Sequence, residues 1–244
     1  MLKIENVTVR TKGDNEANDI TLLNDVCMEV GEGEVIVLNG KNGSGKSSLL
    51  SAIMGHPNYN ISRGDITVGN IKLKINDTLS SAQAGLYITM QSVPEIEGVS
   101  LIQLLHKAIT KQKYNRENKN EYNKSRSQMS ILDLNKEMNG YCEEFGIDKS
   151  FIQRDLNYKM SGGEKKQSEL LHLLALRPKY VLLDEIDSGV DRDSIDKIYQ
   201  VINYLKNNYN TGFIIVSHHT DVSKYTTVSA VYNIENKEVK IVNE

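Results

Sequence analysis

The chain has 244 residues, enough for one large domain or two small ones with a hydrophobic core. Its 29 basic and 32 acidic residues give a net charge of −3, which argues against nucleic acid as a partner. No stretch of 18 apolar residues occurs, and the N-terminus lacks a basic segment followed by an apolar run. We therefore expect a cytoplasmic protein without direct membrane insertion.

The first ninety residues contain short runs rich in β-branched and apolar residues, which are typical of strands. Strands are predicted at 2–9, 21–30 and 35–38, a helix at 47–54, a hairpin-like region at 66–75, and a buried strand at 86–90 that ends at Gln91. At 35–54 the order is strand, glycine-rich loop, helix, which indicates a phosphate-binding loop.

The second half alternates helical patterns with buried strands. Helices are predicted at 101–109, 131–145 and 163–176. The apolar runs at 180–183 and 213–216 are expected for central parallel strands that are covered on both faces. This alternation predicts an α/β fold.

A polar insertion, KQKYNRENKNEYNKSRSQ at 111–128, carries six basic and two acidic residues. Two interpretations stay open: a solvated loop or frayed helix, or a surface that docks an acidic partner. The two cysteines, Cys27 and Cys142, are too few and too far apart for a metal site or a disulfide framework. We expect both to be buried small hydrophobic residues.

The glycine-rich loop GKNGSGKSS has the composition of a nucleotide phosphate site. Its glycines let successive backbone N–H groups point at phosphate oxygens, at the positive end of the following helix. Lys46 supplies a charge to the β- and γ-phosphates, and Ser47 a hydroxyl to the bridging Mg²⁺. The predicted ATP-binding residues are Gly40, Lys41, Asn42, Gly43, Ser44, Gly45, Lys46, Ser47 and Ser48.

Polar residues follow several buried strands, where the carboxyl edge of a parallel sheet collects catalytic groups. Asp184 is expected to hold Mg²⁺ through water, and Glu185 to orient or deprotonate the attacking water. Gln91 could sense the metal or the water, and His218 could hydrogen-bond the γ-phosphate. The predicted catalytic set is Lys46, Gln91, Glu185 and His218, and the predicted Mg²⁺ set is Ser47, Gln91 and Asp184.

A second loop, SGGEKK at 161–166, starts a helix with a serine cap and forms another N-terminal anion site. Because the chain already has a complete phosphate loop, we expect Ser161, Gly162 and Gly163 to face the γ-phosphate held by a second copy. The alternative is an ordinary capped helix.

These motifs, in this order, resemble those of the ATP-binding cassette (ABC) ATPases over nearly the whole chain. The matching segments are Gly40–Ser47 (Walker A), Gln91 (Q-loop), Ser161–Glu164 (signature), Leu182–Glu185 (Walker B), Ser188, Gly189, Val190 and Asp191 (D-loop) and His218 (switch histidine). The resemblance implies one ABC ATPase domain that hydrolyses ATP with Mg²⁺ between two copies. It also implies a RecA-like P-loop core with an antiparallel β lobe at about 1–91 and 166–244, and a helical lobe at about 92–165.

Finer features are similar to one branch, the SufC ATPases of the SUF iron-sulfur cluster assembly machinery. The similar segments are GHPNYNISRG at 55–64, EIEGVS at 95–100, SGGEKK at 161–166 and DEIDSGVD at 184–191. The resemblance implies a SufB-like scaffold partner, with or without a SufD-like one, that docks near 91–100. Gln167 and Glu97 depart from the branch's usual basic residue and proline, and no aromatic residue occurs between Leu2 and Val30 to stack on adenine.

Two other functions stay open: the ATP-binding subunit of a membrane transporter, which shares every catalytic motif, and a nucleotide-gated scaffold without turnover. A further hypothesis concerns Lys166, which could hold Glu185 away from the attacking water until a partner binds. The alternative is a solvated Lys166.

Overall fold

The computed structural model describes residues 1–11, 19–89, 94–111, 126, 128–217 and 221–242. The chain divides into two compact units. The sheet unit comprises 1–89, 178–188 and 206–244, and the helical unit comprises 90–177 and 189–205. Gln91, His218 and most of the 111–128 insertion lie outside the described residues.

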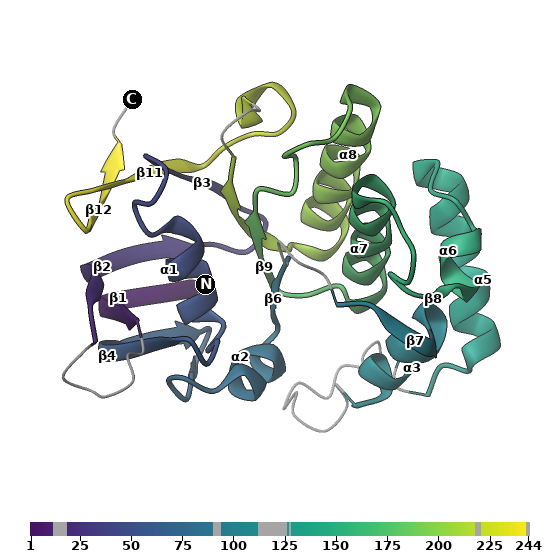
Figure 1. Ribbon diagram of the computed structural model, residues 1–244, viewed down its shortest axis with the longest axis horizontal. Helices are drawn as coiled ribbons and strands as arrows, with labels where there is room; N and C mark the ends of the chain where they lie inside the picture. The colour runs from purple at the N-terminus through teal and green to yellow at the C-terminus, as the bar shows by residue number, and fades with distance from the viewer. Residues whose placement is uncertain (12–18, 90–93, 112–125, 127, 218–220, 243–244) are drawn as a thin grey trace. The chain divides into compact units, whose positions relative to one another are not determined.

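An antiparallel sheet opens the sheet unit (Figure 1). Its strands, in spatial order, are β2 (Thr21–Val30), β1 (Leu2–Thr11), β4 (Tyr59–Val68) and β5 (Ile71–Lys72). The predicted strands at 2–9 and 21–30 are confirmed. The hairpin expected at 66–75 is only partly right. β4 begins earlier, at Tyr59, and this residue pairs with the last residue of β1.

The second sheet of this unit carries the phosphate loop. Its strands, in spatial order, are β12 (Glu238–Val242), β11 (Ala230–Glu235), β3 (Val35–Gly40), β10 (Gly212–Val216), β9 (Tyr180–Asp184) and β6 (Leu86–Ile88). All neighbours pair in parallel except β11 with β12. Every residue of β9 and β10 is buried, which confirms the central parallel strands predicted from their apolar runs.

Helices α1 (Lys46–Ile53) and α2 (Thr78–Ala84) complete the sheet unit with the short 3-10 helix η3 (Val222–Lys224). Leu49, Leu50 and Ile53 of α1 are buried in one core with both sheets. This packing fixes the axis of α1 and therefore the direction in which its N-terminus points. Burial of three such side chains contributes about 1.5–3 kcal/mol each to holding it there.

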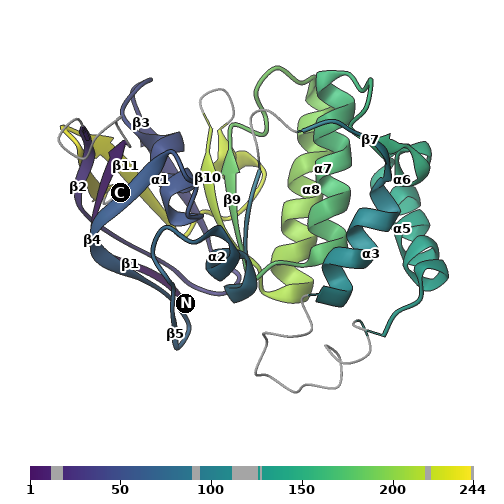
Figure 2. The same cartoon turned by 60° about the horizontal axis from the view of Figure 1, so that its bottom comes forward.

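The helical unit contains five helices among the described residues (Figure 2). They are α3 (Leu101–Lys111), α5 (Ile131–Phe145), α6 (Ser150–Gln153), α7 (Gly162–Leu176) and most of α8 (Arg192–Tyr209). α3 packs against both α5 and α7. No helix among the described residues is both long and apolar enough to cross a bilayer.

A small antiparallel pair lies at one end of the helical unit. It joins β7 (Ile96–Ser100) to β8 (Asp155–Leu156), with Ile96 opposite Leu156.

Near the C-terminal end of the 111–128 insertion, the Arg126 guanidinium binds the Glu137 carboxylate at 2.9 Å and the carbonyl of Ala175. One of the insertion's six basic residues thus makes its contacts within the helical unit.

The expectation for the cysteines is half right. Cys142 is buried, and burial raises the pKa of its thiol to about 11. Cys27 is exposed. Because Val26 and Met28 face the core, the two-residue period of β2 turns Cys27 to the other face, where its Sγ lies 3.4 Å from Asn6 Oδ1.

Candidate functional site

The phosphate loop runs from the end of β3 into the first turn of α1. Gly43 and Gly45 have φ of 76° and 105°, a backbone region that residues other than glycine rarely adopt. Gly45 occupies the N-cap of α1 and offers no side chain to cap it. The first N–H groups of α1 are therefore left for a ligand oxygen.

Lys46 is held inside this loop, with only 5% of its surface exposed. Its ammonium donates to the carbonyls of Gly40 at 2.7 Å and Lys41 at 3.0 Å. Burial lowers the pKa of Lys46, and the charges of Glu185 and Asp184 raise it. The ammonium is therefore positioned at the loop before nucleotide binds, and phosphate oxygens can replace the carbonyl contacts.

Two further observations fit the loop to phosphate. The buried Ser44 hydroxyl has no hydrogen-bond partner among the described residues. A Cβ at Gly43 would meet no atom within 4 Å, so this glycine borders open space. A buried hydroxyl without a partner among the described residues and an open glycine, both next to a cation and a helix N-terminus, suit the β- and γ-phosphates of a nucleotide.

The structure brings Ser47 and Asp184 together. Ser47 Oγ donates to Asp184 Oδ1 at 3.0 Å, which joins α1 to the end of β9. The two oxygens are hard ligands of the kind that Mg²⁺ prefers, and one carboxylate with water and phosphate suffices for this ion. Bound there, Mg²⁺ would neutralise charge that develops on the phosphates. Among the described residues no group of three or more His, Cys, Asp or Glu forms a denser metal site.

Thr89 is a functional residue that sequence reasoning missed. Its hydroxyl accepts the backbone N–H of Asp184 at 3.0 Å and donates to the carbonyl of Leu182 at 3.4 Å. Thr89 itself is 3% exposed. The signal was a threonine in the apolar run LYITM two residues before Gln91, and its effect is to fix the strand end that carries Asp184.

Glu185 follows Asp184 in a left-handed conformation, with φ of 52°. This region is costly for a residue with a side chain and is often found at functional sites. The backbone N–H of Glu185 donates to Val216 at 3.0 Å, and its carbonyl accepts the N–H of Ser188 at 3.0 Å. These bonds hold the turn that lifts Glu185 out of the strand.

Asp187 also went unrecognised in the sequence. It is 2% exposed and accepts a 2.6 Å hydrogen bond from the Ser217 hydroxyl, so it ties the turn after β9 to the residue that follows β10. Its other carboxylate oxygen has no partner among the described residues. The sequence signal was the third acidic residue of DEID at 184–187. Gln91 and His218 themselves lie outside the described residues.

The second loop begins α7 in the helical unit. The Ser161 hydroxyl accepts the N–H of Glu164 at 3.3 Å, and Glu164 accepts the N–H of Ser161 at 2.7 Å, a complete capping box. A Cβ at Gly162 or Gly163 would meet no atom of the described residues within 4 Å. The fold of the chain alone therefore gives no steric reason for either glycine.

The segment 188–191 leads into α8. Gly189 has φ of 68°, which glycine adopts without strain. Asp191 caps α8, because its carboxylate accepts the N–H of Ser194 at 2.9 Å and its hydroxyl at 3.1 Å.

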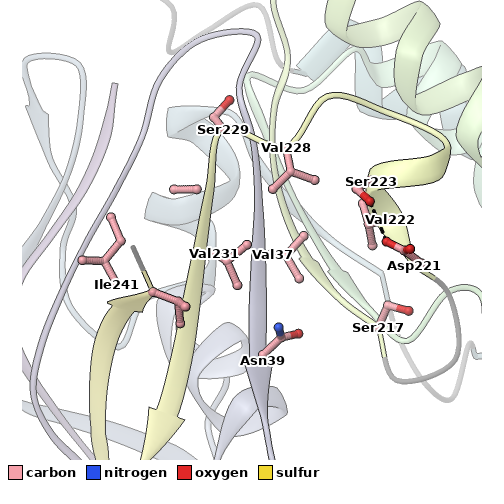
Figure 3. Close-up of a pocket in the computed structure, with 12 residues that line it drawn as sticks. Val37, Asn39, Ser217, Asp221, Val222, Ser223, Val228, Ser229, Val231 and Ile241 are labelled. Carbon is pink, nitrogen blue, oxygen red and sulfur yellow. Dashed lines mark hydrogen bonds between the residues drawn. The ribbon is translucent and has the colours of Figure 1, made fainter. Parts of the chain in front are cut away.

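A pocket of about 650 Å³ is lined in part by side chains of β3 (Figure 3). Figure 3 shows Val37 and Val231 along its wall and Asp221 bound to Ser223. Among the described residues, none of the phosphate loop lines it. This pocket is therefore separate from the phosphate loop.

Comparison with known proteins identifies the family of the chain. The family model described as "ABC transporter" matches residues 23–188. "Vegetative protein 296" of Bacillus subtilis is 35% identical over 211 residues, covering 86% of this chain and 77% of its own. "Probable ATP-dependent transporter slr0075" of Synechocystis is 33% identical over 225 residues, covering 92% and 82%.

Solved structures share the fold. A structure titled "Dimeric Structure of MJ0796, a Bacterial ABC Transporter Cassette" covers 100% of both chains with a TM-score of 0.74 and 21% identity. The same cassette in "a post-hydrolysis state … bound to ADP and Pi" has a TM-score of 0.72 and 21% identity. The chain described here belongs to the ABC transporter family and has the ATPase domain of that family, which binds and hydrolyses ATP with Mg²⁺.

Proposed function

We propose that two copies of this chain close on ATP at a composite interface, and that this cycle changes the conformation of a SufB-like scaffold, with or without a SufD-like one, during iron-sulfur cluster assembly. In each site, Lys46, Ser47 and Asp184 bind ATP and Mg²⁺. Glu185 acts on the attacking water, Gln91 senses the metal or the water, and His218 hydrogen-bonds the γ-phosphate. Ser161 to Glu164 of the other copy contact the γ-phosphate, and Ser188 to Asp191 lie at the interface.

The observation that carries the composite site is the open space at Gly162 and Gly163. Each glycine in a helix costs about 0.5–1 kcal/mol relative to alanine, and no atom of the described residues fills the space beside Gly162 or Gly163. An approaching phosphate would use that room together with the N–H groups of the first turn. The dimeric cassette of the same fold supports this arrangement.

A soluble scaffold is supported by the stretch EIEGVS. In the structure most of it forms β7, whose first three residues are exposed. The side chain of Ile96 is 40% exposed, although it is apolar. An exposed strand with an apolar residue offers backbone and side-chain contacts to a partner protein.

The second candidate is the ATP-binding subunit of a membrane transporter. The names of several relatives favour it, among them "Probable ABC transporter ATP-binding protein SpyM3_0208" of Streptococcus pyogenes, 32% identical over 232 residues and covering 95% of this chain and 84% of its own. Both candidates use the same ATPase chemistry and differ in the partner alone.

One experiment tests the composite site, and a second identifies the partner. The Glu185→Gln variant with ATP should form a stable dimer in sedimentation, and a strictly monomeric variant would contradict the composite site. Affinity purification of the tagged chain from its native cell, without detergent and then with it, should recover a SufB-like protein in both cases. Recovery of a membrane-spanning protein only in detergent would establish the transporter subunit instead.

A further inference from the structure

The stretch that follows Gln91 is fastened to the loop that precedes α7. β7 pairs with β8, and the Gly98 N–H donates to Asp155 Oδ2 at 2.9 Å. Five residues after β8 the chain reaches Ser161. The two segments are about sixty residues apart in sequence, yet they form one structure within the helical unit.

Glu95 contacts the chain on both sides of Ser161. Its Oε1 lies 2.7 Å from Lys165 Nζ, one residue beyond the capping box, and its Oε2 accepts the Lys159 N–H at 3.5 Å. These bonds lower the pKa of Glu95, with the Lys165 hydrogen bond as the largest cause. One carboxylate therefore binds the chain on both sides of the serine cap.

The loop between β8 and α7 needs such support. Asn157 and Lys159 have φ of 55° and 52°, which are strained for residues with side chains. Asn157 is fully buried, and its side-chain N–H donates to the carbonyl of Pro94 at 3.1 Å. The strained turn is thus held by contacts to two adjacent residues, Pro94 and Glu95.

We propose that Glu95 is a positioning residue for the ATPase reaction: through Lys165 and the Lys159 backbone it holds Ser161 in place for the ATP of a second copy. Without this carboxylate the turn can relax, and the first turn of α7 must be ordered again at each closure. A partner that binds the exposed strand β7 would act on Ser161 through the same contacts. The inference rests on the composite site of the proposed function, but not on the identity of the scaffold.

Loss of the pair between Glu95 and Lys165 should weaken dimer closure modestly at each site. Because the dimer has two such sites, the free-energy change should count twice. The side chains of Lys165 and Glu95 are 25% and 43% exposed, and ion pairs of this kind are weak. Loss of the pair should weaken closure by roughly threefold per site. Because a two-fold dimer contains two such sites, its dissociation constant should rise about tenfold.

The test uses sedimentation of the full chain in the Glu185→Gln background with ATP and Mg²⁺. Adding Glu95→Gln should raise the dimer dissociation constant about tenfold and leave ATP affinity of the dilute monomer unchanged. The reversed pair, Glu95→Lys with Lys165→Glu, should restore part of the dimerisation that each single reversal removes. The control Glu97→Gln, two residues further along the chain and also exposed, should dimerise like its parent.

The outcomes distinguish the two proposals. Equal dimerisation by the Glu95→Gln variant and its parent would overturn the role of Glu95, as would a reversed pair no better than its single variants. If the Glu185→Gln parent itself stays monomeric with ATP, the composite site fails and the positioning role fails with it. Absence of a SufB-like partner would overturn only the proposed assembly function.

Discussion

The Ser47 hydroxyl donates a 3.0 Å hydrogen bond to the Asp184 carboxylate, and this contact joins the first turn of α1 to the end of β9. Asp184 is 7% exposed, so its charge is largely removed from water. Its backbone is fixed by Thr89 and its side chain by Ser47. The position of the Asp184 carboxylate thus depends on contacts from outside its own strand.

Asp184→Asn should separate the charge of this residue from its hydrogen bond. The asparagine oxygen can still accept from Ser47, but it lacks the negative charge that holds Mg²⁺. We expect kcat for ATP hydrolysis to fall about a hundredfold, as for loss of a charge-stabilising group, and more Mg²⁺ to be needed for half-maximal activity. Steady-state ATPase assays across Mg²⁺ concentrations measure both.

The matched control is Ser51→Ala, one turn further along α1, which should leave the Mg²⁺ dependence unchanged. Ser47→Ala should shift it in the same direction as Asp184→Asn. An Asp184→Asn enzyme with the parent's Mg²⁺ dependence would refute the metal role of Asp184.

Thr89→Val should destabilise the protein and slow the reaction. Valine has nearly the same shape but leaves the buried N–H of Asp184 without its acceptor, which costs about 1–3 kcal/mol in free energy of unfolding. Urea denaturation and ATPase assays measure the two effects. Thr89→Ser, which keeps the hydroxyl, should recover most of both, and equal loss in the two variants would mean that the methyl group matters instead.

The capping box of α7 should make stability depend on pH. The pKa of Glu164 is lowered from 4.5, first by the Ser161 N–H and then by the Ser161 hydroxyl and Arg154. A lowered pKa in the folded state contributes stability above the unfolded value, and that contribution is lost as pH falls below 4.5 through the folded value. The carboxylate therefore stabilises the fold at neutral pH and not in acid.

Comparison with Glu164→Gln isolates this contribution, because the other carboxylates are common to both proteins. The wild type should be the more stable at pH 7, and the difference should shrink as the pH falls below 4.5. Denaturant midpoints measured across this range give the result. A difference that stays constant with pH would show that the charge of Glu164 contributes nothing.

Elements with a continuous or periodic apolar pattern were predictable from the sequence. β9 and β10 follow from runs of buried residues, and α5 was predicted at its observed bounds, 131–145. Their burial repeats with the period of the backbone, and that period is visible in a sequence. The phosphate loop was equally predictable, because the turn needs glycines at fixed positions and these can be read from the sequence.

Elements held by polar contacts were missed. α2 buries only Ser81 and Ala84, and it begins where the Asp77 carboxylate accepts two N–H groups, so no apolar stripe marks it. β7 is mostly exposed and pairs with a strand of two residues. The Glu95 to Lys165 contact depends on that pairing, and such long-range pairing of short strands leaves no pattern in either segment.

The restraint predicted for Lys166 can be tested by measuring the basal rate of ATP hydrolysis. Lys166 is half-buried on α7. If it restrains Glu185 in the resting state, Lys166→Ala should raise basal ATPase activity roughly fivefold, about 1 kcal/mol, and leave the partner-stimulated rate near that of the wild type. Unchanged basal and stimulated rates would show that Lys166 imposes no restraint.

Gly163→Ala should stabilise the isolated chain while impairing its reaction. A Cβ there meets no atom within 4 Å, and alanine favours a helix over glycine by up to about 1 kcal/mol. If the ATP of a second copy occupies that space, the added methyl group should weaken ATP-dependent dimerisation and lower kcat. Thermal unfolding without nucleotide and sedimentation with ATP measure the two effects separately.

Gly140 provides the matched control in the same unit. It lies in the interior of α5, and a Cβ at this position also meets no atom within 4 Å. Gly140→Ala should therefore raise the midpoint of thermal unfolding and leave ATPase activity unchanged. If Gly163→Ala behaves in the same way, with full activity, then the space beside Gly163 is not used by nucleotide, and the first turn of α7 serves only as a capped helix.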